Sequence, residues 1–120
     1  MDFKIEMAND VVVLIPAGNL VASETEFLKS QVEKLLEKKF RFILLDMSRI
    51  DFMDSSGLGS VIAVNKLVTG TAGVFVCAAL QEGVKKVFRV TRADQKIAVA
   101  ETQSDGLLLI QDRKLQGKGR

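Results

Sequence analysis

Two aspartates, three serines and two glycines stand together in "RIDFMDSSGLGSVIAV", residues 49–64, before the chain turns apolar. Hydroxyl groups beside carboxylates raise the question of a serine nucleophile. Such a serine would sit in a GxSxG turn and would need a base to take its proton. Here the order is Asp54-Ser55-Ser56-Gly57, and the chain contains no histidine. The pattern therefore argues against catalysis by these serines, and we expect no enzyme activity.

The same stretch could instead bind a phosphate group. Backbone N–H groups at a helix start, helped by Gly57 and Gly59, form such sites in other proteins. However, "GLGSV" lacks both the full GxGxxG pattern and the Gly-Lys-Ser/Thr of a P-loop. Asp51 and Asp54 would also repel a phosphate. A nucleotide or small-molecule binding module thus stays only an alternative, and we expect no cofactor.

Helix capping is the plainest interpretation of the polar residues. Asp54, Ser55 and Ser56 are all preferred at the N-cap, where a side-chain oxygen accepts a hydrogen bond from the first-turn amides. Capping leaves room for modification of a serine hydroxyl. A phosphate carries about −1.5 to −2 charges, which the helix dipole would tolerate while an acidic partner would be repelled. Spacing alone allows this modification but does not predict it.

Composition excludes several other kinds of site. Without histidine and with Cys77 as the lone cysteine, histidine-ligated zinc and CxxC sites are excluded, and we expect no metal. The net charge of +2 is too small to indicate DNA binding. The start "MDFKIEMAND" does not have the layout of a signal peptide, and no apolar stretch approaches a membrane span. A cytoplasmic protein with a buried Cys77 is expected.

Hydrophobic periodicity predicts the elements that position this stretch. Alternating Phe3, Ile5 and Met7 predict a strand, and "VVVLIP" a second one in a hairpin, with Pro16 near the strand end. Ser23 and Glu26 form a capping-box pattern before a helix that ends near Lys39.

Continuous apolar runs predict strands that are covered on both faces. These runs are "FILLDM" and "TAGVFVCAAL", and the helix expected between them has Leu58, Val61, Ile62 and Val68 on one face. A third helix over 81–90, a short strand "KIAVAE" and a helix over "GLLLIQDRKL" follow. The predicted order ββαβαβαβα indicates an α/β fold with a mixed, mostly parallel sheet of about five strands and about four helices.

The predicted domain covers residues 1–112, with a flexible basic tail over 113–120. "DSSGLGS" should lie in a loop between a strand and a helix, at the carboxyl edge of the sheet where ligands and partners commonly bind.

The run "IDFMDSSGLGSVIAV" resembles the signature of the bacterial anti-sigma factor antagonists, which are STAS domains. The eight residues from Phe52 to Gly59 carry most of this resemblance. It extends over nearly the whole chain, because "LLEKKFRFILLDMSRIDFMDSSGLG" and "GVFVCAALQEGVKKVFRVT" resemble the central and later blocks of the family. The order of elements expected above is also that of the family's fold.

The resemblance implies a function in partner switching. In the family, a serine-protein kinase that is itself the anti-sigma factor phosphorylates the first serine of the pair, which is Ser55 here. The unphosphorylated antagonist binds this kinase and frees the sigma factor, whereas the phosphorylated form dissociates and a serine phosphatase resets it. The residues expected to form the partner-binding loop are Asp54, Ser56, Gly57, Leu58 and Gly59.

The chain departs from the family pattern at two positions. Val21 stands where an aspartate is common, and Arg92 stands where a glycine is usual, so we expect an altered loop after the third helix. An alternative function is a STAS scaffold or partner-switch subunit that does not act directly on a sigma factor. The basic face of the third helix, with Lys85, Lys86 and Arg89, is either solvated or a partner contact.

Overall fold

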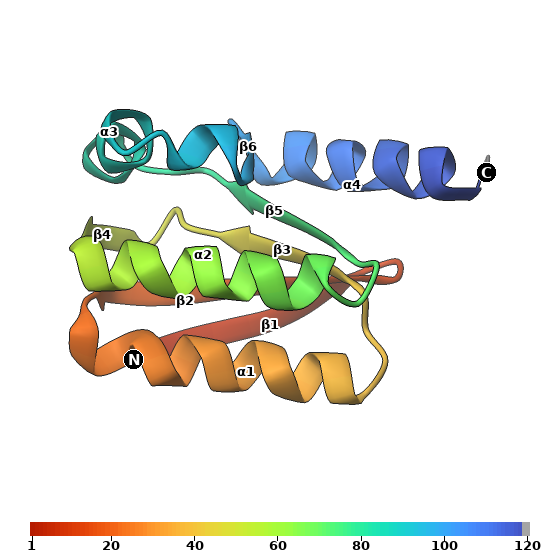
Figure 1. Cartoon of the computed structure of the whole chain (residues 1–120), viewed down its shortest axis with the longest axis horizontal. Helices are drawn as coiled ribbons and strands as arrows, with labels where there is room; N and C mark the ends of the chain where they lie inside the picture. The colour runs from red at the N-terminus through yellow and green to blue at the C-terminus, as the bar shows by residue number, and fades with distance from the viewer. Residues whose placement is uncertain (119–120) are drawn as a thin grey trace.

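A computed structural model describes residues 1–118, which form a six-stranded sheet flanked by helices (Figure 1). The strands are β1 (Asp2–Ala8), β2 (Val11–Leu20), β3 (Phe42–Asp46), β4 (Ile50–Met53), β5 (Val74–Ala78) and β6 (Ala98–Ala100). The α-helices are α1 (Thr25–Glu37), α2 (Ser55–Thr69), α3 (Glu82–Val90) and α4 (Gln103–Lys118). Short 3-10 turns, η1 (Ala22–Glu24) and η2 (Ala93–Gln95), precede α1 and β6.

The sheet has the order β1-β2-β3-β5-β6, with β4 paired to the far end of β2. β1 is antiparallel to β2, whereas the other pairings are parallel. The predicted mixed, mostly parallel sheet is therefore confirmed. One strand, β4, was not predicted from the sequence, because its four residues are buried only at the two ends and show neither clear alternation nor a continuous apolar run.

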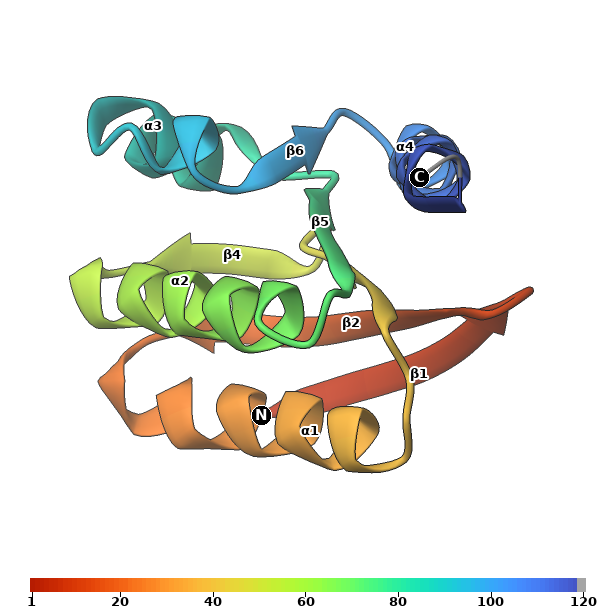
Figure 2. The same cartoon turned by 45° about the vertical axis from the view of Figure 1, so that its right-hand side comes forward.

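Helices cover both faces of the sheet (Figures 1 and 2), and a cluster of buried apolar side chains lies on each face. On one face Val12 and Leu14 of β2 pack with the apolar sides of α1, α2 and α3. On the other face Val11 and Val13 belong to a smaller cluster that Ile110 of α4 completes. Strands covered on both faces need apolar residues at every position, which explains the continuous runs in β3 and β5.

Pro16 lies inside β2 and not near its end, so that expectation is wrong. It pairs with Phe3 of β1. On its other side, β3 pairs with β2 as far as Leu14, and β4 begins to pair at Gly18. The proline falls between these two contacts, where the missing N–H group costs no hydrogen bond to a parallel strand.

The prediction of a capping box at Ser23 is also wrong. Ser23 lies in η1, and α1 begins at Thr25 with no side-chain hydrogen bond from its N-cap residue, Glu24. The Thr25 hydroxyl instead donates to the Ala22 carbonyl at 3.0 Å. The turn η1 shifts the helix start beyond the serine. At its other end α1 stops at Glu37, and Lys39 takes a positive φ of 74°.

Helix α4 continues through Lys118, past the boundary predicted at residue 112. Lys114 forms an ion pair with Asp10 in the β1–β2 turn, and its ammonium group lies 4.6 Å from the centre of the Phe42 ring.

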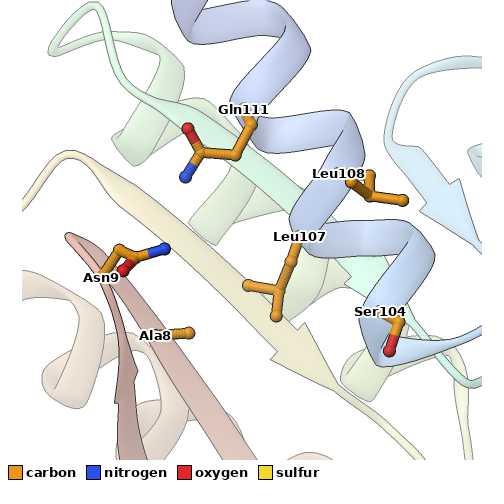
Figure 3. Close-up of a pocket in the computed structure, with 6 residues that line it drawn as sticks. All are labelled: Ala8, Asn9, Ser104, Leu107, Leu108 and Gln111. Atoms are coloured by element: carbon orange, nitrogen blue, oxygen red, sulfur yellow. The ribbon is translucent and has the colours of Figure 1, made fainter.

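Nearer the start of α4, a shallow hollow of about 370 Å³ separates this helix from the β1–β2 turn. Its lining residues are Ala8, Asn9, Ser104, Leu107, Leu108 and Gln111 (Figure 3). The last two residues of the predicted tail, 119 and 120, lie outside the described residues.

Candidate functional site

The stretch 54–59 begins α2 immediately after β4 (Figure 2). β4 runs parallel to the last residues of β2, with Ile50 opposite Gly18 and Met53 opposite Leu20. The carboxyl ends of two strands therefore meet beside the helix start. This placement agrees with the predicted position at the carboxyl edge of the sheet.

Asp54 is the N-cap residue of α2. Its Oδ1 atom accepts a hydrogen bond of 2.8 Å from the Gly57 N–H, and its backbone is extended. One of three residues was expected to cap the helix, and the structure assigns this role to Asp54. Ser55 and Ser56 become the first two helical residues, so their hydroxyl groups are not needed for capping.

Gly57 is the point where α2 touches β2. A Cβ atom at this position would lie 2.0 Å from the Leu20 carbonyl oxygen and 3.1 Å from the Met53 Cγ atom. Real side chains do not tolerate the first of these distances, so a glycine is required for this close approach. Gly59, two residues further, has no atom within 4 Å of its Cβ position and is exposed.

The side chains of this loop divide between surface and core. Ser55 and Ser56 are exposed, and neither hydroxyl has a hydrogen-bond partner in the part of the chain that the structure describes. Leu58 is only 6% exposed and packs in the core, and Gly57 is buried as well. These two residues can shape the loop, but they offer a partner little surface.

The surface next to the serines includes two residues of β4. Asp51 and Phe52 are exposed, and Phe52 keeps 55% of its surface accessible. Gln81 holds this segment, since its Nε2 atom donates to the Ser48 carbonyl at 3.0 Å and to Asp51 Oδ1 at 3.3 Å. The exposure of Phe52 was not predicted from the sequence, because β4 itself was not predicted.

Ser56 differs from Ser55 in its surroundings. It lines a shallow hollow of about 380 Å³ between α1 and α2, together with Ala22, Thr25, Glu26, Lys29, Ser60 and Ala63. Ser55 does not line this hollow. Periodicity could not reveal it, because its two walls are more than 25 residues apart in the chain.

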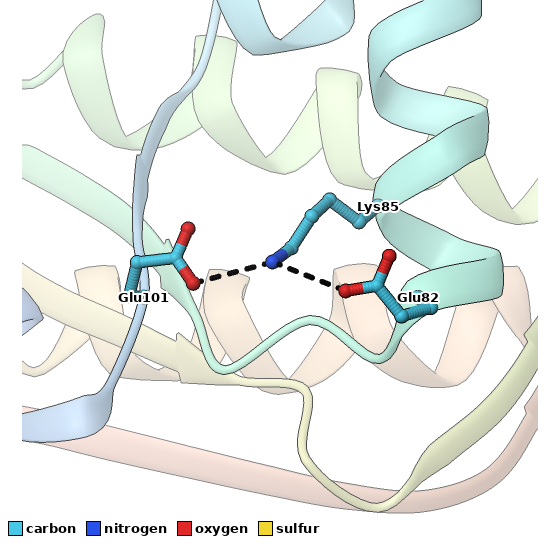
Figure 4. A network of polar contacts seen from close by, with 3 residues as sticks. All are labelled: Glu82, Lys85 and Glu101. Atoms are coloured by element: carbon cyan, nitrogen blue, oxygen red, sulfur yellow. Dashed lines mark hydrogen bonds and ion pairs between the residues drawn. The ribbon is translucent and has the colours of Figure 1, made fainter.

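The basic face of α3 is partly neutralised within the molecule. Lys85 contacts Glu101 at 3.2 Å and Glu82 at 3.6 Å (Figure 4). The hydrogen bond to Glu101 is the main reason why the pKa of Lys85 is raised. Lys86 and Arg89 remain exposed.

Arg92 takes a left-handed conformation, with φ 62° and ψ 21°. Its N–H donates to the Arg89 carbonyl at 3.2 Å, which ends the turn after α3. Glycine adopts this conformation most readily. With an arginine at this position the turn is still left-handed, but the arginine backbone is strained. The other departure, Val21, has an extended backbone directly after β2.

Metal-binding clusters, membrane spans and the lone cysteine can be examined over residues 1–118. This part of the chain holds no cluster of three or more histidine, cysteine, aspartate or glutamate side chains that could bind a metal ion. Among these residues no helix is both long and apolar enough to cross a bilayer. Cys77 is fully buried in β5, as expected for a small apolar side chain.

Comparisons with known proteins agree with this description. The STAS domain model matches residues 2–106. A candidate anti-sigma factor antagonist of Thermotoga neapolitana is 30% identical over 112 residues, which cover 92% of this chain and 99% of that protein. A candidate anti-sigma factor antagonist of Thermotoga maritima has a crystal structure with a TM-score of 0.85 and 25% identity, covering 91% of this chain and 94% of that one.

A more distant structure shares the fold. The Bacillus cell fate determinant SpoIIAA, in its phosphorylated form, matches with a TM-score of 0.68 and 22% identity over 88% of this chain and 96% of that one. The family model covers most of the chain, and the two Thermotoga relatives match nearly their full length. The chain therefore belongs to the STAS domain family, among the anti-sigma factor antagonists.

Proposed function

We propose that this chain binds an anti-sigma factor that is also a serine-protein kinase, and that phosphorylation of Ser55 ends this binding. A serine phosphatase then removes the phosphate from the phosphorylated form and restores binding to the kinase. The observation that carries the proposal is the position of Ser55, which is exposed at the first residue of α2 and has a hydroxyl free of hydrogen bonds within residues 1–118.

The geometry suits a phosphorylation substrate. A kinase supplies the nucleotide and the metal ion, so its substrate needs only an accessible hydroxyl. The chain thus needs no catalytic base of its own, and its lack of histidine is no obstacle. Because the kinase uses ATP, this function also places the chain in the cytoplasm.

Electrostatics can explain how the phosphate would end the binding. Asp54 directly precedes Ser55, and the exposed Asp51 lies on β4, the strand that leads into this helix start. A phosphate would add about −1.5 to −2 charges to this acidic surface. The helix dipole favours negative charge at this end of α2, so the fold would persist while a surface that fits the neutral loop would be repelled.

The surface that a partner would contact is defined by exposure. Phe52, Ser55, Ser56 and Gly59 are accessible, whereas Asp54 and Gly57 hold the helix start in place. Phe52 offers a large apolar side chain, which is typical of residues that dominate binding energy. Gly59 leaves space above the helix, so a partner could approach its backbone closely.

Phosphorylation can be tested with the serine pair as a matched control. The chain is incubated with ATP and each serine-protein kinase of the anti-sigma type from the same organism, and the phosphate is located by peptide mass spectrometry. The wild type and Ser56→Ala should each gain one phosphate, and Ser55→Ala should gain none. Phosphate on Ser55→Ala, or none on the wild type with every kinase, would contradict the assignment.

Binding is tested separately by calorimetry with the same kinase. Ser55→Asp should bind at least tenfold more weakly than the wild type, whereas Ser55→Ala should bind normally. Far-UV circular dichroism should show that both variants are folded. Pull-down experiments identify the assembly, and recovery of partners without a kinase that also holds a sigma factor would favour a scaffold function instead.

A further inference from the structure

Strand β1 forms an open edge of the sheet. It is the first strand in the order β1-β2-β3-β5-β6 and pairs only with β2 among the described residues. Its apolar residues share one face, and their exposed fractions rise along the strand from 36% at Phe3 to 45% at Ile5 and 53% at Met7. Phe3 packs edge-to-face on Phe27 of α1, with ring centres 4.9 Å apart, so α1 covers only the start of this row.

This edge has only part of the usual protection against pairing. Natural sheets protect exposed edges with prolines, bulges, very short strands or charged side chains, and of these β1 has only the charges of Asp2, Lys4 and Glu6. β1 pairs with β2 in an unbroken register from Asp2 to Ala8 and contains no proline. A seven-residue edge with a half-exposed apolar row is therefore suited to accept another strand.

The charges of β1 indicate which strand it accepts. When two copies pair antiparallel with their apolar residues on the same face, the two-fold axis passes through a residue of β1. An axis through Lys4 places this lysine against its own copy, and an axis through Glu6 does the same for the glutamate. An axis through Ile5 places Lys4 opposite Glu6 twice, with Phe3 opposite Met7 and Ile5 opposite Ile5.

We propose that β1 binds the β1 strand of a second copy of this chain, antiparallel and with the two-fold axis at Ile5. The two sheets then join into one, and the exposed apolar rows of both copies cover each other between the two α1 helices. Opposite charges directly across such a strand pair stabilise it, and like charges destabilise it. An axis through Phe3 would also place Lys4 opposite an acidic residue, Asp2, but it leaves Met7 without a partner. The axis at Ile5 is the one that combines opposite charges with pairing of all seven residues of β1.

The proposed contact leaves the Ser55 loop accessible. β1 pairs with β2 only as far as Ala17, on the edge of β2 away from β3 and β4. β2 therefore lies between the contact and the β4–α2 junction. A dimer would present two separate partner-binding surfaces.

Charge exchange provides a sharp test by sedimentation velocity of the full chain from micromolar to millimolar concentration. The wild type should dimerise. Lys4→Glu and Glu6→Lys should each weaken dimerisation about tenfold, because each replaces two attractive cross-strand pairs by two repulsive ones. The double variant Lys4→Glu/Glu6→Lys should restore the dimer, since it exchanges the charges without changing the register.

Mixing supplies an independent check. The two single variants should associate with each other more tightly than either does with itself. Lys86→Glu, an exposed charge change on α3, serves as the control and should leave dimerisation unchanged. A wild type that stays monomeric at millimolar concentration would overturn the proposal, and so would a double variant as weak as the single ones. Urea unfolding of each variant shows whether its monomer is folded.

Discussion

The two glycines at the start of α2 should respond in opposite ways to the same substitution. At Gly57 an added methyl group would lie 2.0 Å from the Leu20 carbonyl oxygen. The obstacle is the backbone of a buried strand, and it cannot rotate away as a flexible side chain would. At Gly59 nothing lies within 4 Å of the same atom.

The magnitudes follow from these two environments. Alanine in a helix is favoured over glycine by about 1 kcal/mol, so Gly59→Ala should raise the free energy of unfolding by roughly 0.5–1 kcal/mol. At Gly57 the same gain in helix propensity is opposed by overpacking, which costs about 1–3 kcal/mol. This cost should lie near the upper end of the range, because the obstacle is backbone. Gly57→Ala should therefore lower the free energy of unfolding by about 1–2 kcal/mol.

Urea unfolding measures both variants under one condition. Far-UV circular dichroism is the suitable signal, because the chain contains neither tryptophan nor tyrosine. The two variants should differ by about 1.5–3 kcal/mol, with the wild type between them. If Gly57→Ala were as stable as Gly59→Ala, the contact between α2 and Leu20 would not constrain this position, and the reasoning would fail.

Three further predictions concern single residues. Asp54→Ala should lower the free energy of unfolding by about 1 kcal/mol in urea, and Asp54→Asn should stay close to wild type, since asparagine caps about as well. Burial raises the pKa of the Cys77 thiol, so it should resist a thiol reagent at pH 8 in the folded protein and react on unfolding; rapid native labelling would contradict this. Arg92→Gly should raise the free energy of unfolding by about 1 kcal/mol, because it relieves the left-handed strain, and a loss of stability would show that the arginine side chain contributes more.

Local patterns predicted most of the architecture. Alternation in β1, continuous apolar runs in β3 and β5, and helical spacing in α1 to α3 depend on neighbours that are close in sequence, and these elements were found where expected. The predicted start of α1 was wrong for a local reason, because a short 3-10 turn displaced it from Ser23. The predicted helix over 106–115 was found, and it begins three residues earlier and ends three residues later.

The candidate site was predicted in part. The sequence and its resemblance singled out residues 54–59, and the structure places them at one exposed helix start. Three residues could have capped the helix, and only the geometry assigned this role to Asp54. Leu58 belonged to the expected partner-binding loop, yet helical spacing turns its side chain into the core.

The sequence by itself determined the order of elements, the lack of histidine chemistry and the polar start of α2, because these depend on residue types and short-range spacing. Tertiary structure alone decided that β4 pairs with the end of β2, that Gly57 lies against the Leu20 carbonyl, and that Ser56 faces α1. Each of these facts joins segments far apart in the chain. Short-range periodicity carries no information on such contacts, since they depend on how the finished elements pack.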